Sequence, residues 1–510
     1  MMMTQSTSDD YSPSERRLVL LICALVTGVS FIDTTALNVA LPFIQRDLNA
    51  TATDTYWVLE IYLLGLAALM MAGGALGDSL GRRRPLRWGV ILFALTSLGC
   101  ALSFNAAMLI FFRALQGISA ALMVPASLAL INASFPPEER GAAIGKWSAL
   151  VSLTIPLGPL FGGIAVDMVA WQAIFWVNIP LCMIVLWLMH GLRRPPFEPP
   201  QSVPLDIAGS IAITISLGLI TFGLMEAGRY GFFTILHLAT ILAGLIMLVV
   251  FIIIETRIAN PMVPPELFRN RRFLIVNLHT LVLFAAFQSA TFFLSFMLVQ
   301  SYGFGATQAG AAALPISILV TLLSRQAGKY TSLHGPRFIL IISSVLMALA
   351  FALMSLTDGS YWQSLFVPML ILGLGVAAFA APVTTVAMAS AGPGKDGLAS
   401  GVNNAVARIG PLLAIAGFGY VIAGDFSTSI ETSQMLAEMP AYVKEYLIAH
   451  KNELGGLVTP ADWPETIRQQ AAESIAQSYA DAVKNIMQIS AFLMILCAFL
   501  ALLYRKEDAV

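Results

Sequence analysis

The sequence contains little charge. Asp, Glu, Lys and Arg make up 11% of its 510 residues, whereas an average soluble domain carries about 25%. Hydrophobic residues make up 58% of the chain, and its mean hydropathy is +0.80. Because roughly 20 consecutive apolar residues cross a bilayer as a helix, this composition predicts an all-α polytopic membrane protein. The apolar runs are too long and continuous for the alternating strands of a membrane β-barrel.

Cysteine and recognisable catalytic motifs are also scarce. Cys23, Cys100, Cys182 and Cys497 stand singly in apolar runs, and no C-x-x-C occurs, so we expect no metal site and no redox chemistry. The sequence has no phosphate-binding loop and no hydrolase motif, which argues against an enzyme, an ATP-driven pump and a bound cofactor. The net charge of −1 gives no reason to expect nucleic acid as a partner.

Long apolar segments dominate what is present. We predict fourteen membrane-spanning helices, each about 20 or more residues long. Their approximate ranges are 16–40, 55–76, 86–104, 107–131, 141–165, 171–192, 205–227, 232–254, 272–300, 306–328, 337–356, 361–390, 397–423 and 482–504.

The positive charges predict the orientation of these segments. Most of the 28 Lys and Arg residues fall on the side of the predicted bundle that also holds both chain ends. Loops rich in Lys and Arg stay in the cytoplasm. We therefore expect a multi-pass protein of the plasma (cytoplasmic, or inner) membrane with cytoplasmic tails at residues 1–15 and 505–510.

Two linkers divide the chain further. Residues 193–204 contain five prolines and predict a stiff cytoplasmic connector. The acidic segment 424–481 predicts a large outer loop, with a helix that begins near Thr459 and runs into the last span. The loop is either a solvated cap without a role in transport or a domain that binds another protein. The expected units are a six-helix bundle at 16–192, a linker with two inserted helices at 193–256, and a second six-helix bundle at 257–504.

The segment Gly74–Leu86 joins the second and third spans with a glycine turn that holds one acid and three arginines. Gly74, Asp78, Gly81 and Arg82 fill the pattern G-x-L-x-D-x-x-G-R, and the segment resembles the signature loop of the major facilitator superfamily. The resemblance implies a cytoplasmic latch that holds the outward-open state. The alternative is an anchor that only keeps positive charge inside the cell.

A similar segment follows the tenth span. It runs from Gly328 to Arg337 and has Ser332 in place of the acid. Such pairs of related segments are typical of transporters built from two related halves. We therefore predict a one-sided latch that depends on Asp78.

Further motifs resemble the fourteen-span drug:proton antiporters of this superfamily. They occur in the family's order between about residues 31 and 410. Departures are Gln172 and Ala173, where the family has Arg-Trp, and Thr154 and Pro156 before the glycine motif. The matching segments are Ile32–Pro42, Arg113–Gly117, Gly158–Gly163, Trp171–Pro180 and Gly397–Gly410.

Three charged residues inside the spans are the candidates for proton coupling. A charge at mid-bilayer costs roughly 2.5–3.5 kcal/mol, so each of them calls for a function or a partner. Asp33 matches the acid of the family motif and is the first candidate proton carrier, with Glu60 second. Arg113 is expected to tune these acids. The alternative for each is a permanent structural ion pair.

Small and polar residues complete the candidate set. The antiporter motif Gly158, Pro159, Gly162 and Gly163 favours a tight seal between helices and implies an exporter, although ordinary helix packing would use the same residues. Seven further residues are candidates for lining a substrate cavity. They are Asn38, Trp57, Gln116, Gln288, Asn403, Asn404 and Arg408.

Together these observations predict a secondary transporter that exports small molecules by alternating access. The family resemblance implies export of amphipathic, often cationic drugs or toxic compounds in exchange for protons. We expect a monomer whose partners are its substrate, protons and membrane lipids. Two alternatives stay open: an exporter of one physiological solute, such as a lipid, siderophore or amino acid, and a non-transporting membrane sensor or partner protein.

Overall fold

The computed structural model describes residues 12–152, 154–192, 206–230, 233–259, 261–390, 396–433, 436 and 439–504. All regular elements in these ranges are helices. They are α1 (Pro13–Asp47), α2 (Ala52–Leu80), α3 (Arg83–Ala101), α4 (Ala106–Ser134), α5 (Pro137–Ser152), α6 (Thr154–Met168), α7 (Ala173–His190), α8 (Ile207–Tyr230), α9 (Ile235–Arg257), α10 (Pro265–Arg269), α11 (Arg271–Phe296), η1 (Met297–Ser301), α12 (Ala306–Ala312), α13 (Leu314–His334), α14 (Pro336–Met354), η2 (Tyr361–Leu365), α15 (Phe366–Ala389), α16 (Asp396–Thr432), α18 (Ala441–Ala449), η3 (Lys451–Gly456) and α19 (Glu465–Ala501).

Local sequence sets where several helices begin and end. Three helices begin with a pair of reciprocal hydrogen bonds. The side chain of the cap residue (Ser12, Thr51 or Thr234) accepts the backbone N–H three residues later, and the side chain of that later residue accepts the backbone N–H of the cap residue. These reciprocal bonds satisfy N–H groups that the first turn of a helix leaves free. Gly81 (φ +81°) ends α2 and Gly335 (φ +85°) ends α13. A residue with a Cβ is strained at such angles, so glycine permits both tight turns.

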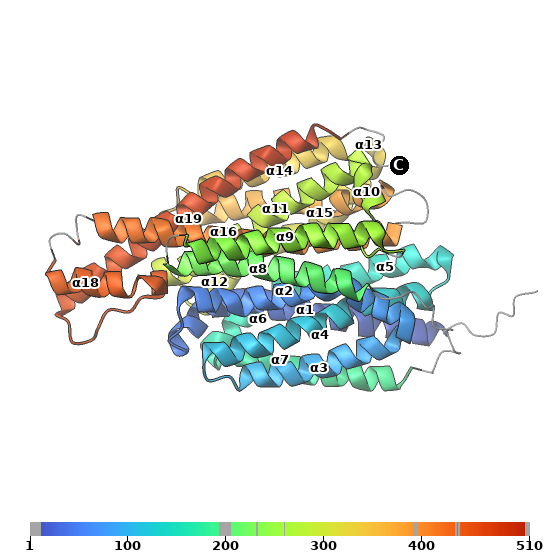
Figure 1. Cartoon of the computed structure of the whole chain (residues 1–510), viewed down its shortest axis with the longest axis horizontal. Helices are drawn as coiled ribbons and strands as arrows, with labels where there is room; N and C mark the ends of the chain where they lie inside the picture. Colours follow the sequence, from blue (N-terminus) through green and yellow to red (C-terminus); the bar gives the residue numbers. More distant parts are fainter. Residues whose placement is uncertain are drawn as a thin grey trace, which may run out of the picture.

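The helices form two groups with an inserted pair between them (Figure 1). Helices α1 to α7 contact mainly one another, and so do α11 to α19, except α12, which contacts mainly α6 of the first group. The pair α8 and α9 packs through α8 against α2 of the first group and α16 of the second. Figure 1 shows α8 and α9 in front, between the blue helices and the orange and red ones. Helix α8 is therefore shared by both groups.

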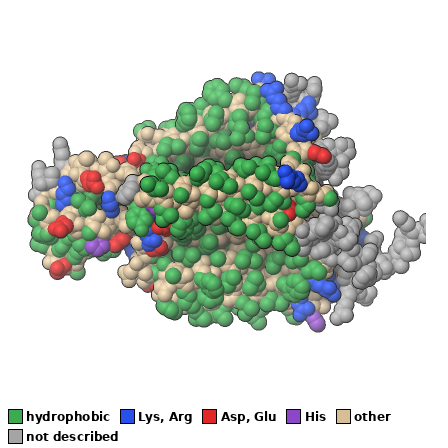
Figure 2. All heavy atoms as spheres, in the orientation of Figure 1, with side chains coloured by type: hydrophobic (Ala, Val, Ile, Leu, Met, Phe, Trp, Pro, Cys, Tyr) green, Lys and Arg blue, Asp and Glu red, His purple; other side chains and the backbone are tan. Residues whose placement is uncertain are grey.

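The two ends of the bundle differ in charge. Apolar side chains cover the middle of the visible face, and Lys and Arg gather at the end opposite α18 (Figure 2). We call this the basic end, and the end that carries α18 and η3 the cap end. Side chains such as Trp187 (72% exposed) and Ile235 (88% exposed) lie on the outside of the bundle. Eleven described helices are long and apolar enough to cross a membrane, as a multi-pass membrane protein requires.

All fourteen predicted segments coincide with helical structure, although the number of membrane crossings stays a prediction. The segment 141–165 covers parts of α5 and α6, and residue 153 between them lies outside the described residues. The last helix begins at Glu465, after Pro464, rather than near Thr459. A helix that began at Pro460 would need a backbone N–H at Pro464, and proline has none. The helix therefore starts after Pro464. The connector 193–204 lies outside the described residues.

Candidate functional site

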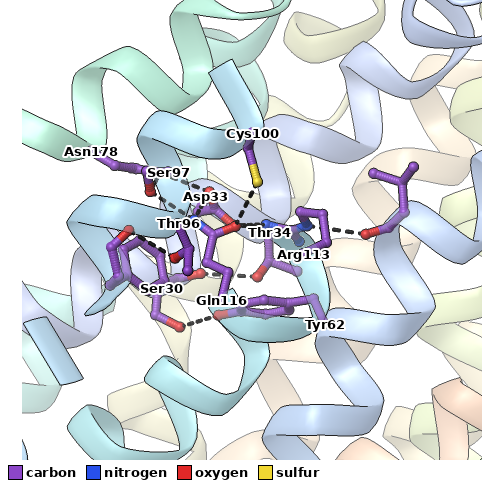
Figure 3. Close-up of polar contacts among 12 residues, drawn as sticks. Ser30, Asp33, Thr34, Tyr62, Thr96, Ser97, Cys100, Arg113, Gln116 and Asn178 are labelled. Carbon is purple, nitrogen blue, oxygen red and sulfur yellow. Dashed lines mark hydrogen bonds and ion pairs between the residues drawn. The ribbon is translucent and has the colours of Figure 1, made fainter. Parts of the chain in front are cut away.

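A buried ion pair lies at the centre of the first helix group (Figure 3). Asp33 comes from the middle of α1 and Arg113 from α4, and neither side chain is exposed. Arg113 Nη1 lies 2.5 Å from Asp33 Oδ2. Asn178 of α7 donates to Asp33 Oδ1 at 2.8 Å. Three apolar helices therefore converge on one carboxylate.

Arg113 is held from several directions. Its Nε donates to the carbonyl of Val58 in α2 at 3.0 Å, and Nη1 donates to Gln116 Oε1 at 2.6 Å. The guanidinium lies 4.3 Å from the ring centre of Tyr62, a distance at which a cation is attracted to an aromatic face. Nη2 has no partner among the described residues.

Amide and hydroxyl groups complete the network around the pair. Gln116 donates to Ser97 Oγ at 2.8 Å, and Asn178 reaches the same oxygen at 3.3 Å. The Tyr62 hydroxyl shares a 2.7 Å hydrogen bond with Ser30. A buried charge is tolerated when it is paired and hydrogen-bonded. We call the set Asp33, Arg113, Gln116, Asn178 and Ser97 the Asp33 cluster.

Glu60 lies in α2 outside the Asp33 cluster. Its side chain is fully buried, and neither carboxyl oxygen has a hydrogen-bond partner among the described residues. The structure therefore pairs Arg113 with Asp33 and not with Glu60. An isolated ionised carboxylate is far too costly to bury, so such a group takes up a proton instead.

The second helix group holds a neutral network. Asn403 of α16 donates to Asn277 Oδ1 at 3.2 Å and to Thr280 Oγ1 at 2.8 Å, both on α11. We call these three residues the Asn403 cluster. On the same helix, the Asn404 side chain is exposed and bonds its own helix at Ser400.

Arg408 lies one turn beyond Asn404 on α16 and is half-buried. Its helix, α16, contacts α2 of the first helix group as well as α11 of the second. The Arg408 side chain has no hydrogen bond or ion pair with any described residue. A positive charge is therefore available between the two groups.

The remaining cavity candidates are dispersed. Asn38 of α1 is half-buried, and its Oδ1 has no described partner. Trp57 packs towards α8, with its ring centre 6.4 Å from that of Phe222. The Gln288 side chain is exposed on α11. Of the seven candidates, the structure brings Gln116 into the Asp33 cluster and Asn403 into its own.

The glycine motif of α6 lies between two helices. A Cβ added at Gly158 or Gly162 would overlap Thr35 or Ala36 of α1, and one at Gly163 would overlap the backbone of Ala306 in α12. Gly310 of α12 is equally close to the backbone of Pro159. Small residues let helix backbones approach in this way. The motif thus joins the two helix groups near the cap end.

Asp167 adds a polar link beside this contact. Its carboxylate accepts the backbone N–H groups of Ala306 at 3.2 Å and Thr307 at 2.8 Å. Charge-assisted bonds of this kind are stronger than neutral ones.

The cap end is also closed by aromatic rings and by η3. Tyr56 of α2 packs edge-on against Phe292, Phe293 and Phe296 of α11, with ring centres 5.4–5.5 Å apart. Gln45 at the end of α1 donates to the carbonyl of Glu453 in η3 at 2.8 Å. It also accepts from Gln300 at 2.9 Å. The cap end of the central region is therefore closed in this conformation.

The signature segment lies at the basic end. Gly81 makes the turn, and Arg82 is the N-cap residue of the next helix, α3. Arg83 donates to the carbonyls of Met189 and Leu192, at 3.0 and 3.1 Å, where α7 ends. A cation at a helix C-terminus is electrostatically favourable. The side chain of Asp78 lies outside the described residues, so the latch it is expected to form stays a prediction.

Two polar residues of the Asp33 cluster were not among the sequence candidates. Asn178 belongs to the Trp171–Pro180 motif, which could have indicated it. Ser97 carries no such signal, because serines are common in apolar helices. Within the described residues, no group of three or more His, Cys, Asp or Glu side chains is placed to hold a metal ion.

Comparison with known proteins identifies the family. The model of the Major Facilitator Superfamily matches residues 23–415. The chain belongs to this superfamily. Its members in the comparison are transporters and not enzymes, which agrees with the prediction from the motifs.

Relatives of this superfamily chain carry names of drug and antibiotic resistance. The Methylenomycin A resistance protein of Bacillus subtilis is 32% identical over 79% of this chain and 87% of its own length. The Multidrug resistance protein Stp of Mycobacterium tuberculosis is 29% identical over 85% and 80%, respectively. Such names support an efflux transporter. Assignment to the fourteen-span antiporter subfamily stays a prediction.

Solved structures share the fold at low sequence identity. A bacterial homolog of the human lysosomal transporter Spinster, in an inward-facing and occupied conformation, has a TM-score of 0.67 at 18% identity and 98% coverage of both chains. The human organic anion transporter MFSD10 has a TM-score of 0.59 at 16% identity, with 96% and 100% coverage. At these identities the likeness shows the fold alone.

Proposed function

We propose that this chain is a proton-coupled antiporter that exports amphipathic, mainly cationic drugs or toxic compounds by alternating access. The observation that carries the proposal is Glu60, a fully buried carboxyl group without a partner in the described structure. Such a group is stable when protonated and can release its proton only when water reaches it. A carboxyl group whose access changes with conformation is what proton coupling requires.

The two acids have different roles in this proposal. Asp33 is ion-paired with Arg113 and is the charged acid in this conformation, whereas Glu60 is the protonated one. This reverses the order that the sequence motifs suggested. Arg113 also bonds the α2 backbone at Val58, two residues before Glu60. A shift of α2 against α4 would therefore change the Asp33 pair and the access of water to Glu60 together.

We infer the orientation from the charges. The basic end faces the cytoplasm, as Lys and Arg do in membrane proteins, and the cap end faces outward. The protein then spans the inner membrane fourteen times as a monomer, with both termini inside. A proton that enters across 100 mV contributes about 2.3 kcal/mol to export.

The substrate class rests on the relatives and on charge. Their names include Methylenomycin A resistance and Methyl viologen resistance. Arg408 favours a second candidate, because a guanidinium without a carboxylate partner attracts an anionic group. An exporter of one physiological solute with a carboxylate or phosphate would use it. Export of several unrelated cationic compounds would argue against that candidate.

The proposal is tested by drug uptake into everted membrane vesicles, with and without a proton uncoupler. Methyl viologen and methylenomycin A are suitable first compounds. We expect uncoupler-sensitive uptake by the wild type and its loss in Glu60→Gln. Glu226→Gln is the matched control, since Glu226 lies in α8 and pairs with Arg229 in the same helix. Uptake by Glu60→Gln that still responds to the uncoupler would contradict the proposal.

A further inference from the structure

Helices α2, α8 and α16 meet in a junction near the cap end, and a small cavity lies within it. Tyr56 of α2, Met225 and Gly228 of α8, and Gly419 of α16 line this cavity. Its volume of about 20 Å³ is enough for one water molecule. Polar groups reach it from the cap side, where the lining includes Ser427, Lys451 and Asn452.

Contacts along α2 and α8 fix which residues lie at the same depth. The helices run antiparallel: Asp54 pairs with Arg229, Trp57 faces Phe222, and Leu64 lies against Gly218. As residue numbers rise along α2, those of their partners in α8 fall. By this pairing, Glu60 of α2 is level with Thr221 of α8.

The faces of the helices agree with this depth. Glu60 follows Tyr56 by four residues, and Thr221 precedes Met225 by four, so each lies one turn deeper on the face that lines the cavity. Thr221 is fully buried, and its hydroxyl has no hydrogen-bond partner among the described residues. The same holds for Glu60. Two polar groups, a carboxyl and a hydroxyl, therefore lie in one junction at one depth, and they are not hydrogen-bonded to each other in this conformation.

We propose that Thr221 is the hydroxyl through which Glu60 receives its proton from the cap end, so that the inserted helix α8 completes the proton site. This inference rests on the proposed role of Glu60. The transfer takes place when α8 brings Thr221 Oγ1 within hydrogen-bond distance of Glu60. A hydronium ion that enters through the cavity then gives a proton to Thr221 Oγ1, and the hydroxyl proton of Thr221 passes to the Glu60 carboxylate. One O–H bond breaks at each donor as one forms at each acceptor. Thr221 ends unchanged, and a water molecule remains.

No charged side chain near the junction bonds Glu60, so none of them passes the proton to it. The charged side chains on the elements around the junction are of both signs. They are Asp54 on α2, Arg113 on α4, Glu226 and Arg229 on α8, Arg408 and Asp425 on α16, and Lys451 and Glu453 on η3, with Tyr56 as a further titratable group on α2. None of them forms an ion pair or hydrogen bond with Glu60 in the described structure.

The test compares Thr221→Val with Thr221→Ser in proteoliposomes that contain the full chain. Thr214→Val is the matched control, because Thr214 bonds the carbonyl of Ser210 in its own helix two turns away. Proton-driven drug transport is measured across external pH, and drug exchange without a gradient reports folding and substrate binding. We expect Thr221→Val to lower proton-driven transport about 100-fold, the lower range for a positioned proton donor, and to shift its pH profile. Exchange should be preserved, and Thr221→Ser should restore transport.

Several outcomes would overturn the inference. If Thr221→Val and Thr214→Val show equal proton-driven transport, Thr221 does not pass the proton to Glu60. An equal loss of exchange and proton-driven transport in both Thr221→Val and Thr221→Ala assigns Thr221 a structural role instead. Glu60→Gln separates the two claims. If it keeps proton-driven transport, the proposed function fails; if it loses transport while Thr221→Val does not, only the relay fails.

Discussion

The Asp33 cluster lies within the first helix group and the Asn403 cluster within the second, and the two clusters join their helices in different ways. Asp33 and Arg113 join α1 to α4 through opposite charges that are both fully buried. Asn403 joins α16 to α11 through neutral amide and hydroxyl groups, at 2.8–3.2 Å. The free energy of a charged network depends on protonation, whereas that of a neutral network does not. We infer that proton sensitivity belongs to the first group, and that the second group contributes a fixed surface and the charge of Arg408.

The largest effect is expected when the charged cluster is broken on one side. Arg113→Met leaves the Asp33 carboxylate buried without its partner, which costs about 3–5 kcal/mol. Thermal unfolding of the purified protein in detergent should show a large loss of stability. The double variant Asp33→Asn with Arg113→Met removes both charges and should recover part of the loss. Equal stability of the single and double variants would contradict this account of the cluster.

The next effect concerns the contact between the two groups. In Gly163→Ala, the new Cβ would overlap the backbone of Ala306, and overpacking of this kind costs about 1–3 kcal/mol. We expect α6 and α12 to separate at the cap end. Labelling of an Ala306→Cys reporter by a membrane-impermeant maleimide should then become faster. Gly417→Ala is the control, since a Cβ there meets nothing within 4 Å. Equal labelling in both variants would count against a seal.

A smaller effect is expected in the neutral cluster. Asn403→Ala leaves Asn277 and Thr280 without one partner, at a cost of about 1–3 kcal/mol. Because no charge is removed, the loss of thermal stability should be the same at pH 6 and pH 8. A pH-dependent loss in Asn403→Ala would remove the distinction between the clusters.

The smallest effect is expected at the cap. Gln45→Ala removes two hydrogen bonds, to Glu453 and Gln300, each worth about 0.5–1.5 kcal/mol. Hydrogen exchange of the η3 amides should become faster while the rest of the protein is unaffected. Gln477→Ala is a suitable control, because Gln477 is exposed and bonds only Asp481. Unchanged exchange in η3 would mean that Gln45 does not hold the cap.

The parts of the fold and site that depend on composition could be predicted from sequence. Apolar length located the helices, and the need to pair a buried charge indicated that Arg113 has a carboxylate partner, either Asp33 or Glu60. The turns at Gly81 and Gly335 have the same positive φ, in agreement with the repeated segment that the sequence suggested.

The choice of partners could not be predicted, because it depends on how helices rotate and cross. Asp33 and Glu60 both lie in apolar helices, and sequence gives no distance from either to Arg113. Ser97 and Thr221 have no motif, and their environment exists only after α3 packs on α7 and α8 packs on α2. The start of α19 was misplaced for a local reason, since two prolines compete to begin that helix.

Proton release on substrate binding tests the central claim most directly. Purified wild-type protein, Asp33→Asn and Glu60→Gln are each mixed with a saturating exported drug in weak buffer that contains a pH-sensitive dye. If Glu60 is the proton carrier, the wild type and Asp33→Asn release protons, whereas Glu60→Gln binds the drug without release. Proton release by Glu60→Gln equal to that of the wild type would contradict the account.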